Sequence, residues 1–287
     1  MAWPPGSLLY SILGFTLGLL SMNSTEKCSP RSSLVALIPA RYGSTRFAKK
    51  MLAPIDGIPM IVRVSQNVAK SGIPTFVVTD SVEIEEIVTL AGGKVLRVDD
   101  EVRTGTERVA VAYKRYFAGK EEFKHITQVI NVQGDEPLTK ENDLTRLADF
   151  MEERGEDFDL FTLVRPRMGV DEEFLSSGVV KVAYNEKNHH CFYFSRAPIP
   201  HYRQVQVEEG EKRHWYQHIG IYGYSTQALL SFLDLPSSPL ERYESLEQLR
   251  FLEEGKKIGA VCTQSVLVSV DYPEDIQRVE GVLRGQK

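Results

Sequence analysis

The 287-residue chain has few cysteines and no excess of positive charge. Its three cysteines are scattered and form no C-x-x-C pair, which argues against a disulfide framework or a zinc site and is typical of a reducing compartment. Lys and Arg number 34 against 39 Asp and Glu, and the formal charge of −5 argues against a basic surface that binds nucleic acid. Repeats, the P-loop pattern G-x-x-x-x-G-K-[ST] and the dinucleotide pattern G-x-G-x-x-G are also absent. The remaining composition, with 42% apolar and 25% charged residues, is that of a globular protein.

Charge is missing altogether from residues 1–25, and residues 7–22 are almost wholly apolar. The stretch LLYSILGFTLGLLSM is shorter than the roughly 20 residues that a bilayer-spanning helix needs. A signal peptide is a poor match, because no Lys or Arg precedes the stretch and no small-x-small cleavage site follows it. Residues 1–33, which end in a polar linker, are therefore expected to lie outside the folded domain. Two alternatives stay open, a weak membrane anchor through residues 7–22 and an upstream extension without a role.

From residue 34 onward, strand-like and helix-like segments alternate. Residues 34–39 (LVALIP) form a continuous apolar run, as in a strand that is buried on both faces. This order predicts an α/β fold with a mainly parallel, doubly wound sheet, and such sheets bind ligands at the carboxyl ends of their strands. The expected strands are 34–39, 75–79, 94–98 and 128–132, and the expected helices are 58–70, 82–91 and 106–117.

The order of elements differs in the second half, where strand-like segments follow one another with few helices between them. This order predicts an antiparallel insertion at about 159–225 within one α/β domain that spans residues 34–285. No linker rich in Pro, Gly or Ser divides that domain into two. The expected strands here are 159–164, 179–184, 191–194, 220–224, 258–263 and 266–270, and the expected helices are 227–233, 240–254 and 274–283.

A basic loop follows the first expected strand. It reads ARYGSTR at 40–46 and continues to Lys49 and Lys50. Gly43 leaves room for backbone N–H groups to approach an anion, and Arg side chains suit bidentate contact with phosphate oxygens. The loop therefore indicates a phosphate site, with a solvated basic loop as the open alternative.

Two aspartates each follow a strand-like segment. Asp135 emerges after the strand at 128–132, where a glycine leaves space for a ligand, and Asp271 follows the last expected strand. Carboxylates at such positions suit Mg²⁺, which binds through one or two carboxylates together with substrate phosphates. Asp271 could equally be only the N-cap of the next helix. The neighbouring Glu136 and Asp275 are expected to be surface or capping residues.

Short motifs spread along the chain are shared with one family. They are IPARYGSTR at 38–46, TD at 79–80, GTER at 105–108, NVQGDEP at 131–137, FSRAPIP at 194–200, HIGIYGY at 218–224, SPLERYESLEQLR at 238–250 and VDYPEDI at 270–276. Together they resemble the CMP-Kdo synthetases, also called 3-deoxy-manno-octulosonate (Kdo) cytidylyltransferases. The resemblance covers about residues 34–285, and HIGIYGY combined with SPLE…LEQLR is its most specific part.

The resemblance implies a Rossmann-like nucleotidyltransferase fold and a reaction in which CTP and Kdo give CMP-Kdo and pyrophosphate, with Mg²⁺ as cofactor. It implies catalytic roles for Arg41, Lys50, Asp135 and Asp271, of which Asp135 and Asp271 would bind Mg²⁺. The nucleotide contacts that it implies are Arg41, Ser44, Arg46, Lys50, Thr79, Asp80, Gly105 and Thr106. The sugar contacts that it implies are Gln133, Arg196, His218, Tyr222, Glu247 and Gln248, with Arg196 suited to the sugar carboxylate. A homodimer built on the antiparallel insertion is also implied, and the cytoplasm is the expected compartment.

One segment departs from the family pattern. After STR the family usually continues with an apolar residue and then Pro-Gly-Lys-Pro-Leu, whereas this chain reads FAKKML at 47–52. Lys50 keeps the register of the family lysine, but either Lys49 or Lys50 could reach a phosphate. The sequence leaves open a related sugar acid, such as 8-amino-Kdo or sialic acid, another nucleotide base, and a binding module without catalysis. Retention of both Asp135 and Asp271 argues against the last of these.

Overall fold

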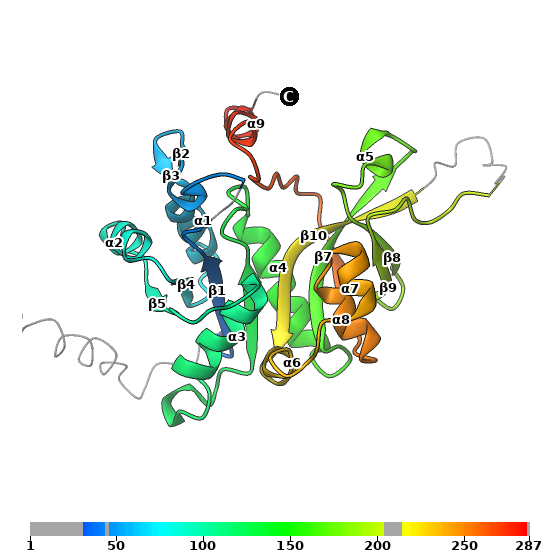
Figure 1. The fold of residues 1–287 in the computed structure, drawn as a ribbon. Helices are drawn as coiled ribbons and strands as arrows, with labels where there is room; N and C mark the ends of the chain where they lie inside the picture. The colour runs from blue at the N-terminus through cyan, green and yellow to red at the C-terminus, as the bar shows by residue number, and fades with distance from the viewer. Residues whose placement is uncertain (1–30, 44–45, 204–213, 286–287) are drawn as a thin grey trace, which may run out of the picture.

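A computed structural model of the protein describes residues 31–43, 46–203 and 214–285. The apolar segment 7–22 and Ser44, on both of which the sequence made predictions, lie outside the described residues. Within the described part, no helix is both long and apolar enough to span a bilayer. One large sheet runs through these residues, and helices cover both of its faces (Figure 1).

The first half of the chain builds a block of parallel strands with helices between them, as its alternating pattern predicts. The elements are β1 (Leu34–Ala40), η1 (Lys50–Leu52), β2 (Pro54–Ile55), β3 (Ile58–Pro59), α1 (Met60–Ala69), β4 (Thr75–Thr79), α2 (Val82–Leu90), β5 (Val95–Arg97), α3 (Gly105–Tyr116), η2 (Glu121–Phe123), β6 (Gln128–Val132) and α4 (Glu141–Arg154). The strands lie in the order β5-β4-β1-β6, all parallel. Every residue of β1 is buried, because strands flank it on both sides and helices cover both faces.

The second half extends the same sheet with strands of both directions. The elements are β7 (Leu160–Met168), α5 (Glu172–Leu175), β8 (Lys181–Asn185), β9 (His190–Ser195), β10 (His214–Ser225), α6 (Thr226–Ser231), α7 (Pro239–Glu244), α8 (Gln248–Glu253), β11 (Ile258–Cys262) and α9 (Asp275–Leu283). Strand β10 lies between β6 and β7 and is antiparallel to both, while β11 is parallel to β7. The full order is β5-β4-β1-β6-β10-β7-β11-β9-β8. The sheet is therefore mixed, and the strands of 159–225 continue it instead of forming a layer of their own.

Two apolar cores lie on opposite faces of the sheet. The first packs α1, α2, α4 and α9 against the strands, with Leu147 and Met151 of α4 among its fully buried side chains. The second packs α3, α6 and α8 against the other face, with Val109, Leu229 and Phe251 among its buried side chains. This three-layer arrangement leaves the strand ends and their loops as the place where polar groups can gather.

Three local expectations were wrong or incomplete. The helix expected over 240–254 is broken into α7 and α8, because Ser245 adopts a left-handed conformation with φ 52° and ψ 51°. The segment 266–270 forms no strand. It instead crosses the carboxyl edge of the sheet, where the N–H of Val270 donates to the carbonyl of Asp135 at 3.0 Å. Helix α4 had no counterpart in the expectations, although its apolar residues at 144, 147, 148 and 151 have helical spacing.

Candidate active site

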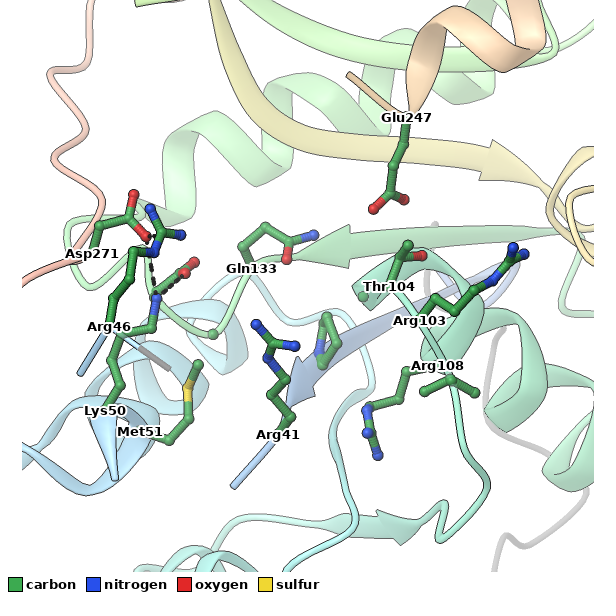
Figure 2. A pocket seen from close by; sticks show the side chains of 15 residues that line it. Arg41, Arg46, Lys50, Met51, Arg103, Thr104, Arg108, Gln133, Glu247 and Asp271 are labelled. Carbon is green, nitrogen blue, oxygen red and sulfur yellow. Dashed lines mark hydrogen bonds and ion pairs between the residues drawn. The ribbon is translucent and has the colours of Figure 1, made fainter. Parts of the chain in front are cut away.

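A pocket of about 300 Å³ lies at the carboxyl ends of β1 and β6, beside the start of α3. Ligands bind at this edge in α/β sheets. Figure 2 shows Arg46, Lys50 and Asp271 joined by ion pairs at one end of the pocket. Glu247 lies farther from this end, on the side of Gln133 and Thr104. The lining residues are Pro39, Arg41, Arg46, Lys50, Met51, Val102, Arg103, Thr104, Gly105, Arg108, Gln133, Gly134, Asp135, Glu247 and Asp271.

The ion-paired group joins the two predicted carboxylates through one ammonium. Lys50 Nζ lies 2.7 Å from Asp135 Oδ2 and 3.7 Å from Asp271 Oδ1. Arg46 Nη2 lies 2.9 Å from the same oxygen of Asp271. The backbone bond from Val270 to Asp135 brings the two aspartates together, since it places the residue before Asp271 directly against Asp135. The carboxylates of Asp135 and Asp271 thus converge on one position, which the ammonium of Lys50 occupies.

These two carboxylates fit a divalent cation of the magnesium type. They supply hard oxygen ligands, and Mg²⁺ is commonly held by one or two carboxylates while phosphate and water oxygens complete its octahedron. The described residues contain no group of three or more His, Cys, Asp or Glu that could hold a metal by themselves. A nucleotide triphosphate in the pocket would therefore have to supply further ligands.

The alternative role of Asp271 as a helix N-cap is wrong. Helix α9 begins at Asp275, and no side chain caps it. The carboxylate of Asp275 instead accepts the N–H groups of Asp271 and Tyr272, both at 2.9 Å. Asp275 is therefore a capping residue of this turn, as expected, and it leaves the carboxylate of Asp271 directed at Arg46 and Lys50.

Glu136 is not a surface residue, contrary to expectation. Its side chain is buried, and the hydroxyl of Ser269 donates to its Oε1 while Oε2 has no partner among the described residues. Burial, together with the negative charge of Asp135, raises the pKa of Glu136 to about 8. This shift favours the protonated, uncharged form of Glu136 near neutral pH.

The basic side chains of the first loop divide between the pocket and the outside. Arg41, Arg46 and Lys50 line the pocket, and Arg41 has no hydrogen-bond or ion-pair partner in the described part of the chain. Lys49 does not line it, because its ammonium pairs with both oxygens of Glu83 at 3.2 Å. Of the two adjacent lysines, Lys50 is therefore the one in position to meet a phosphate.

Asp80 and Arg108 connect the neighbouring strand ends. The carboxylate of Asp80 accepts the N–H of Tyr42 at 3.1 Å and the guanidinium of Arg108 at 2.8 Å. Arg108 also donates to the carbonyl of Val98 at 2.8 Å, and its side chain is buried. Arg108 therefore holds the loop that carries Arg41 in place through Asp80.

Of the remaining residues predicted to contact the nucleotide, Gly105 lines the pocket, whereas Thr79 and Thr106 are buried and do not line it. Thr79 is fully buried and its hydroxyl accepts the N–H of Ser81, and Thr106 is also buried. Gly105 lines the pocket, where an added Cβ would lie 3.1 Å from Gln133 Oε1, so the close approach of these residues favours glycine. Arg103 and Thr104 also line the pocket and were missed, as was Arg108. The available signal was the GTER motif at a helix start, where Thr104 is the N-cap.

Several buried polar atoms on the Glu247 side have no hydrogen-bond partner among the residues that the structure describes. Gln133 Nε2 donates to Asn131 Oδ1 at 3.2 Å, and the hydroxyl of Tyr222 donates to Gln248 Oε1 at 3.1 Å. Burial raises the pKa of Glu247. Unpaired buried polar atoms are rare in folded proteins, so a group of them beside a pocket indicates that a polar ligand completes their hydrogen bonds. The unpaired atoms here are Asn131 Nδ2, Glu247 Oε2 and Gln248 Nε2.

Four of the six predicted sugar contacts do not line this pocket, namely Arg196, His218, Tyr222 and Gln248. His218 packs against Phe194 and Tyr222, and its Nε2 lies 3.2 Å from Thr162 Oγ1. Arg196 directs its guanidinium at backbone carbonyls, among them that of Glu244 at 2.7 Å. The sequence gave no sign that the guanidinium N–H groups of Arg196 already donate to backbone carbonyls.

Replacing His218 by Gln is expected to make the protein less sensitive to acid. Burial lowers the pKa of His218 to about 3, whereas the unfolded chain binds the proton near the ordinary value of about 6.5. The free energy of unfolding of the wild type should therefore fall as the pH decreases from about 6.5, by up to about 1.4 kcal/mol per unit for this group. Urea unfolding at several pH values between 4 and 7 would measure the difference between the two proteins, with the exposed His125→Gln as control. Parallel pH profiles for wild type and H218Q would contradict the prediction.

Comparison with known proteins shows the family of this chain. The family model described as cytidylyltransferase matches residues 35–258. The chain is 38% identical over 252 residues to the 3-deoxy-manno-octulosonate cytidylyltransferase of Thermodesulfovibrio yellowstonii, covering 87% of this chain and 97% of that protein. It is 40% identical over 260 residues to the enzyme of the same name from Syntrophotalea carbinolica, covering 88% and 99%.

Solved structures extend the likeness to the fold. The structure of CMP:2-keto-3-deoxy-manno-octonic acid synthetase complexed with CTP is 31% identical, covers 89% of this chain and 100% of its own, and superposes with a TM-score of 0.77. A nucleotidyl transferase from Methanothermobacter thermautotrophicus, 16% identical with a TM-score of 0.57, shares the fold over 89% of this chain and 99% of its own. The chain therefore belongs to the cytidylyltransferase family and, within it, to the 3-deoxy-manno-octulosonate cytidylyltransferases.

Proposed function

We propose that this protein transfers CMP from CTP to the anomeric hydroxyl of Kdo and releases pyrophosphate, which activates the sugar for lipopolysaccharide or related cell-envelope synthesis. The observation that carries the proposal is the pair of Asp135 and Asp271 on the ammonium of Lys50, at the end of a pocket that two further Arg side chains of the same loop line. Family membership supports the choice of nucleotide and sugar.

The cations of the pocket suit a triphosphate. Transfer of a nucleotidyl group depends mainly on positioning the reactants and on neutralising charge, because the protein need not form a covalent bond to either. Arg41, Arg46 and Lys50 would bind the triphosphate and stabilise the negative charge of the departing pyrophosphate. On binding, the phosphates would compete with Asp135 and Asp271 for Lys50 and Arg46, which frees both carboxylates.

Asp135 and Asp271 would hold Mg²⁺, and that ion when bound supplies Lewis-acid polarisation of the α-phosphate and of the attacking hydroxyl. The residues of the chain do the positioning. Gly134 allows the loop of Asp135 to lie tightly against β1, since an added Cβ would be 2.8 Å from the carbonyl of Pro39.

The remaining contacts divide between the base and the sugar. Asp80, Gly105 and Thr106, with Thr79 behind them, would shape the cytidine pocket. Kdo is a polyhydroxylated acid, so the unpaired polar atoms of Glu247 and Gln248 would meet its hydroxyls, together with Gln133. Tyr222 orients Gln248 by its hydrogen bond, and the neutral His218 packs against Tyr222.

We also infer a homodimer that forms through the 159–225 region. Met168, Leu175 and Phe192 there are each more than half exposed, and a partner subunit would cover them. Light scattering coupled to gel filtration would measure the mass. The cytoplasm, where CTP is available, is the compartment that the proposed reaction requires.

The proposed function is tested by pyrophosphate release with CTP, Mg²⁺ and one sugar acid at a time. We expect release with Kdo, and none without a sugar or without Mg²⁺. Sialic acid and 8-amino-Kdo are the comparison substrates, and UTP and ATP the comparison nucleotides. Release with sialic acid or 8-amino-Kdo but not with Kdo would transfer the assignment to that sugar acid. No release with any of them would support a binding module without catalysis.

A further inference from the structure

The loop between α7 and α8 is tied to the end of β9 by a compact group of hydrogen bonds. The carboxylate of Glu244, the last residue of α7, accepts the hydroxyl of Ser195 at 2.6 Å and the N–H of Arg196 at 2.8 Å. Three residues farther along lies Glu247, which lines the pocket, followed by Gln248. Glu244 therefore lies at the point where the α7–α8 loop meets the rest of the domain.

This loop contains the left-handed residue that separates the two helices. Ser245 has φ 52° and ψ 51°, a conformation that is unfavourable for a residue with a Cβ and persists only where the surroundings hold it. The guanidinium of Arg196 donates through Nε to the carbonyl of Glu244 at 2.7 Å and through Nη2 to that of Ser245 at 3.4 Å. These carbonyls belong to the two peptide groups on either side of Ser245. One side chain therefore holds both peptide planes that define the left-handed turn.

Arg196 is itself held from the other side. Its Nη1 donates to the carbonyl of Ser177 at 3.0 Å, and its own carbonyl accepts from Lys181 Nζ at 2.5 Å. The buried ammonium of Lys181 also donates to the carbonyls of Ser176 and Val179, at 2.8 and 2.7 Å. Burial lowers the pKa of Lys181, and the charge of Glu244 opposes that change. Glu244 is thus the carboxylate that balances two cations gathered around the turn.

We propose that Glu244 and Arg196 are positioning residues, which hold Ser245 in its left-handed turn so that Glu247 faces the pocket and Gln248 meets Tyr222. The inference rests on the proposed function for the role of Glu247 and Gln248 toward the sugar. Residues 240–254 have the sequence pattern of one continuous helix, and without the turn α7 and α8 would tend toward that helix. Glu247 and Gln248 would then rotate away from their present directions.

The test uses Glu244→Ala alone and combined with Ser245→Gly. Loss of the Glu244 carboxylate should raise KM for Kdo about tenfold or more, with a smaller change in kcat and CTP affinity within about twofold of wild type. Glycine populates the left-handed region readily, so the double variant should recover much of the lost affinity for Kdo. Glu254→Ala, which removes an exposed carboxylate at the end of α8, is the matched control and should behave as wild type.

The outcomes separate the two proposals. If the wild-type protein does not turn over Kdo, the proposed function is overturned. The positioning role is then tested by the KM of the same variants for the sugar acid that the wild type does turn over. A wild type active on Kdo, with Glu244→Ala showing the same KM for Kdo, overturns the positioning role. So does a raised KM that Ser245→Gly fails to reduce. Circular dichroism and thermal melting would check folding, and Glu244→Gln, which keeps an acceptor for Ser195, replaces Glu244→Ala in both arms if the latter does not fold.

Discussion

Replacing Asp135 by Asn is expected to lower kcat for pyrophosphate release by at least about a thousandfold. The substitution keeps the size of the side chain but removes one of two charges that converge at the end of the pocket. Without it, Lys50 and Arg46 would outweigh the single remaining carboxylate of Asp271, and a divalent cation would be bound weakly. Steady-state assays with saturating CTP and Kdo, over a range of Mg²⁺ concentrations, would measure the loss.

The control for this variant is Asp149→Asn on the surface of α4. Asp149 pairs with Arg31 at 3.5 Å and its side chain is 64% exposed, so its removal should leave both activity and stability unchanged. Thermal melting should show that D135N is folded, because Asp135 lies at a loop and not within the core. A D135N enzyme with more than a tenth of the wild-type kcat would remove Asp135 from the magnesium site.

Replacing Lys50 by Met is expected to lower kcat/KM for CTP by about a hundredfold or more. The ammonium is the group shared by Asp135 and Asp271, and it is the lysine placed to meet the triphosphate. Methionine fills much of the same apolar space, so the effect should come from the missing charge and not from a cavity. Initial rates at varied CTP, with Kdo saturating, would give the ratio.

Lys49→Met is the matched control, since it removes an adjacent ammonium of the same loop. That ammonium pairs with Glu83 outside the pocket, and its side chain is 57% exposed. We expect kcat/KM for CTP within about threefold of wild type. A larger loss in K49M than in K50M would reverse the assignment of the two lysines.

The parallel block and its helices could be predicted because their signals are local. The apolar run of β1, the capped start of α2 and the glycine at the start of α3 each act within a few residues. Helix α4 carried the same kind of signal and was nevertheless missed. The break at Ser245 had no local signal, since serine gives no preference for a left-handed conformation. The carbonyls on both sides of the turn accept from Arg196, which directly follows β9.

The site residues divide in the same way. Asp135 was predictable because a strand end followed by a glycine is a local pattern. The burial of Glu136 could not be predicted, because Ser269, which donates to it, lies 133 residues farther along the chain. Arg196 and Asp80 carry charges that suit a ligand, yet both are engaged by neighbouring groups, which only the folded structure reveals.

By itself, the sequence determined the alternation of strands and helices in the first half, the motifs of the family and the ends of strands at which charged residues gather. The tertiary structure alone decided that Asp135 and Asp271 share one ammonium, that Lys50 and not Lys49 lies in the pocket, and that β10 separates two groups of parallel strands. The physical reason is the range of the interactions. Helix periodicity, caps and strand patterns depend on neighbours along the chain, whereas ion pairs, burial and backbone bonds such as that from Val270 to Asp135 join segments that only folding brings together.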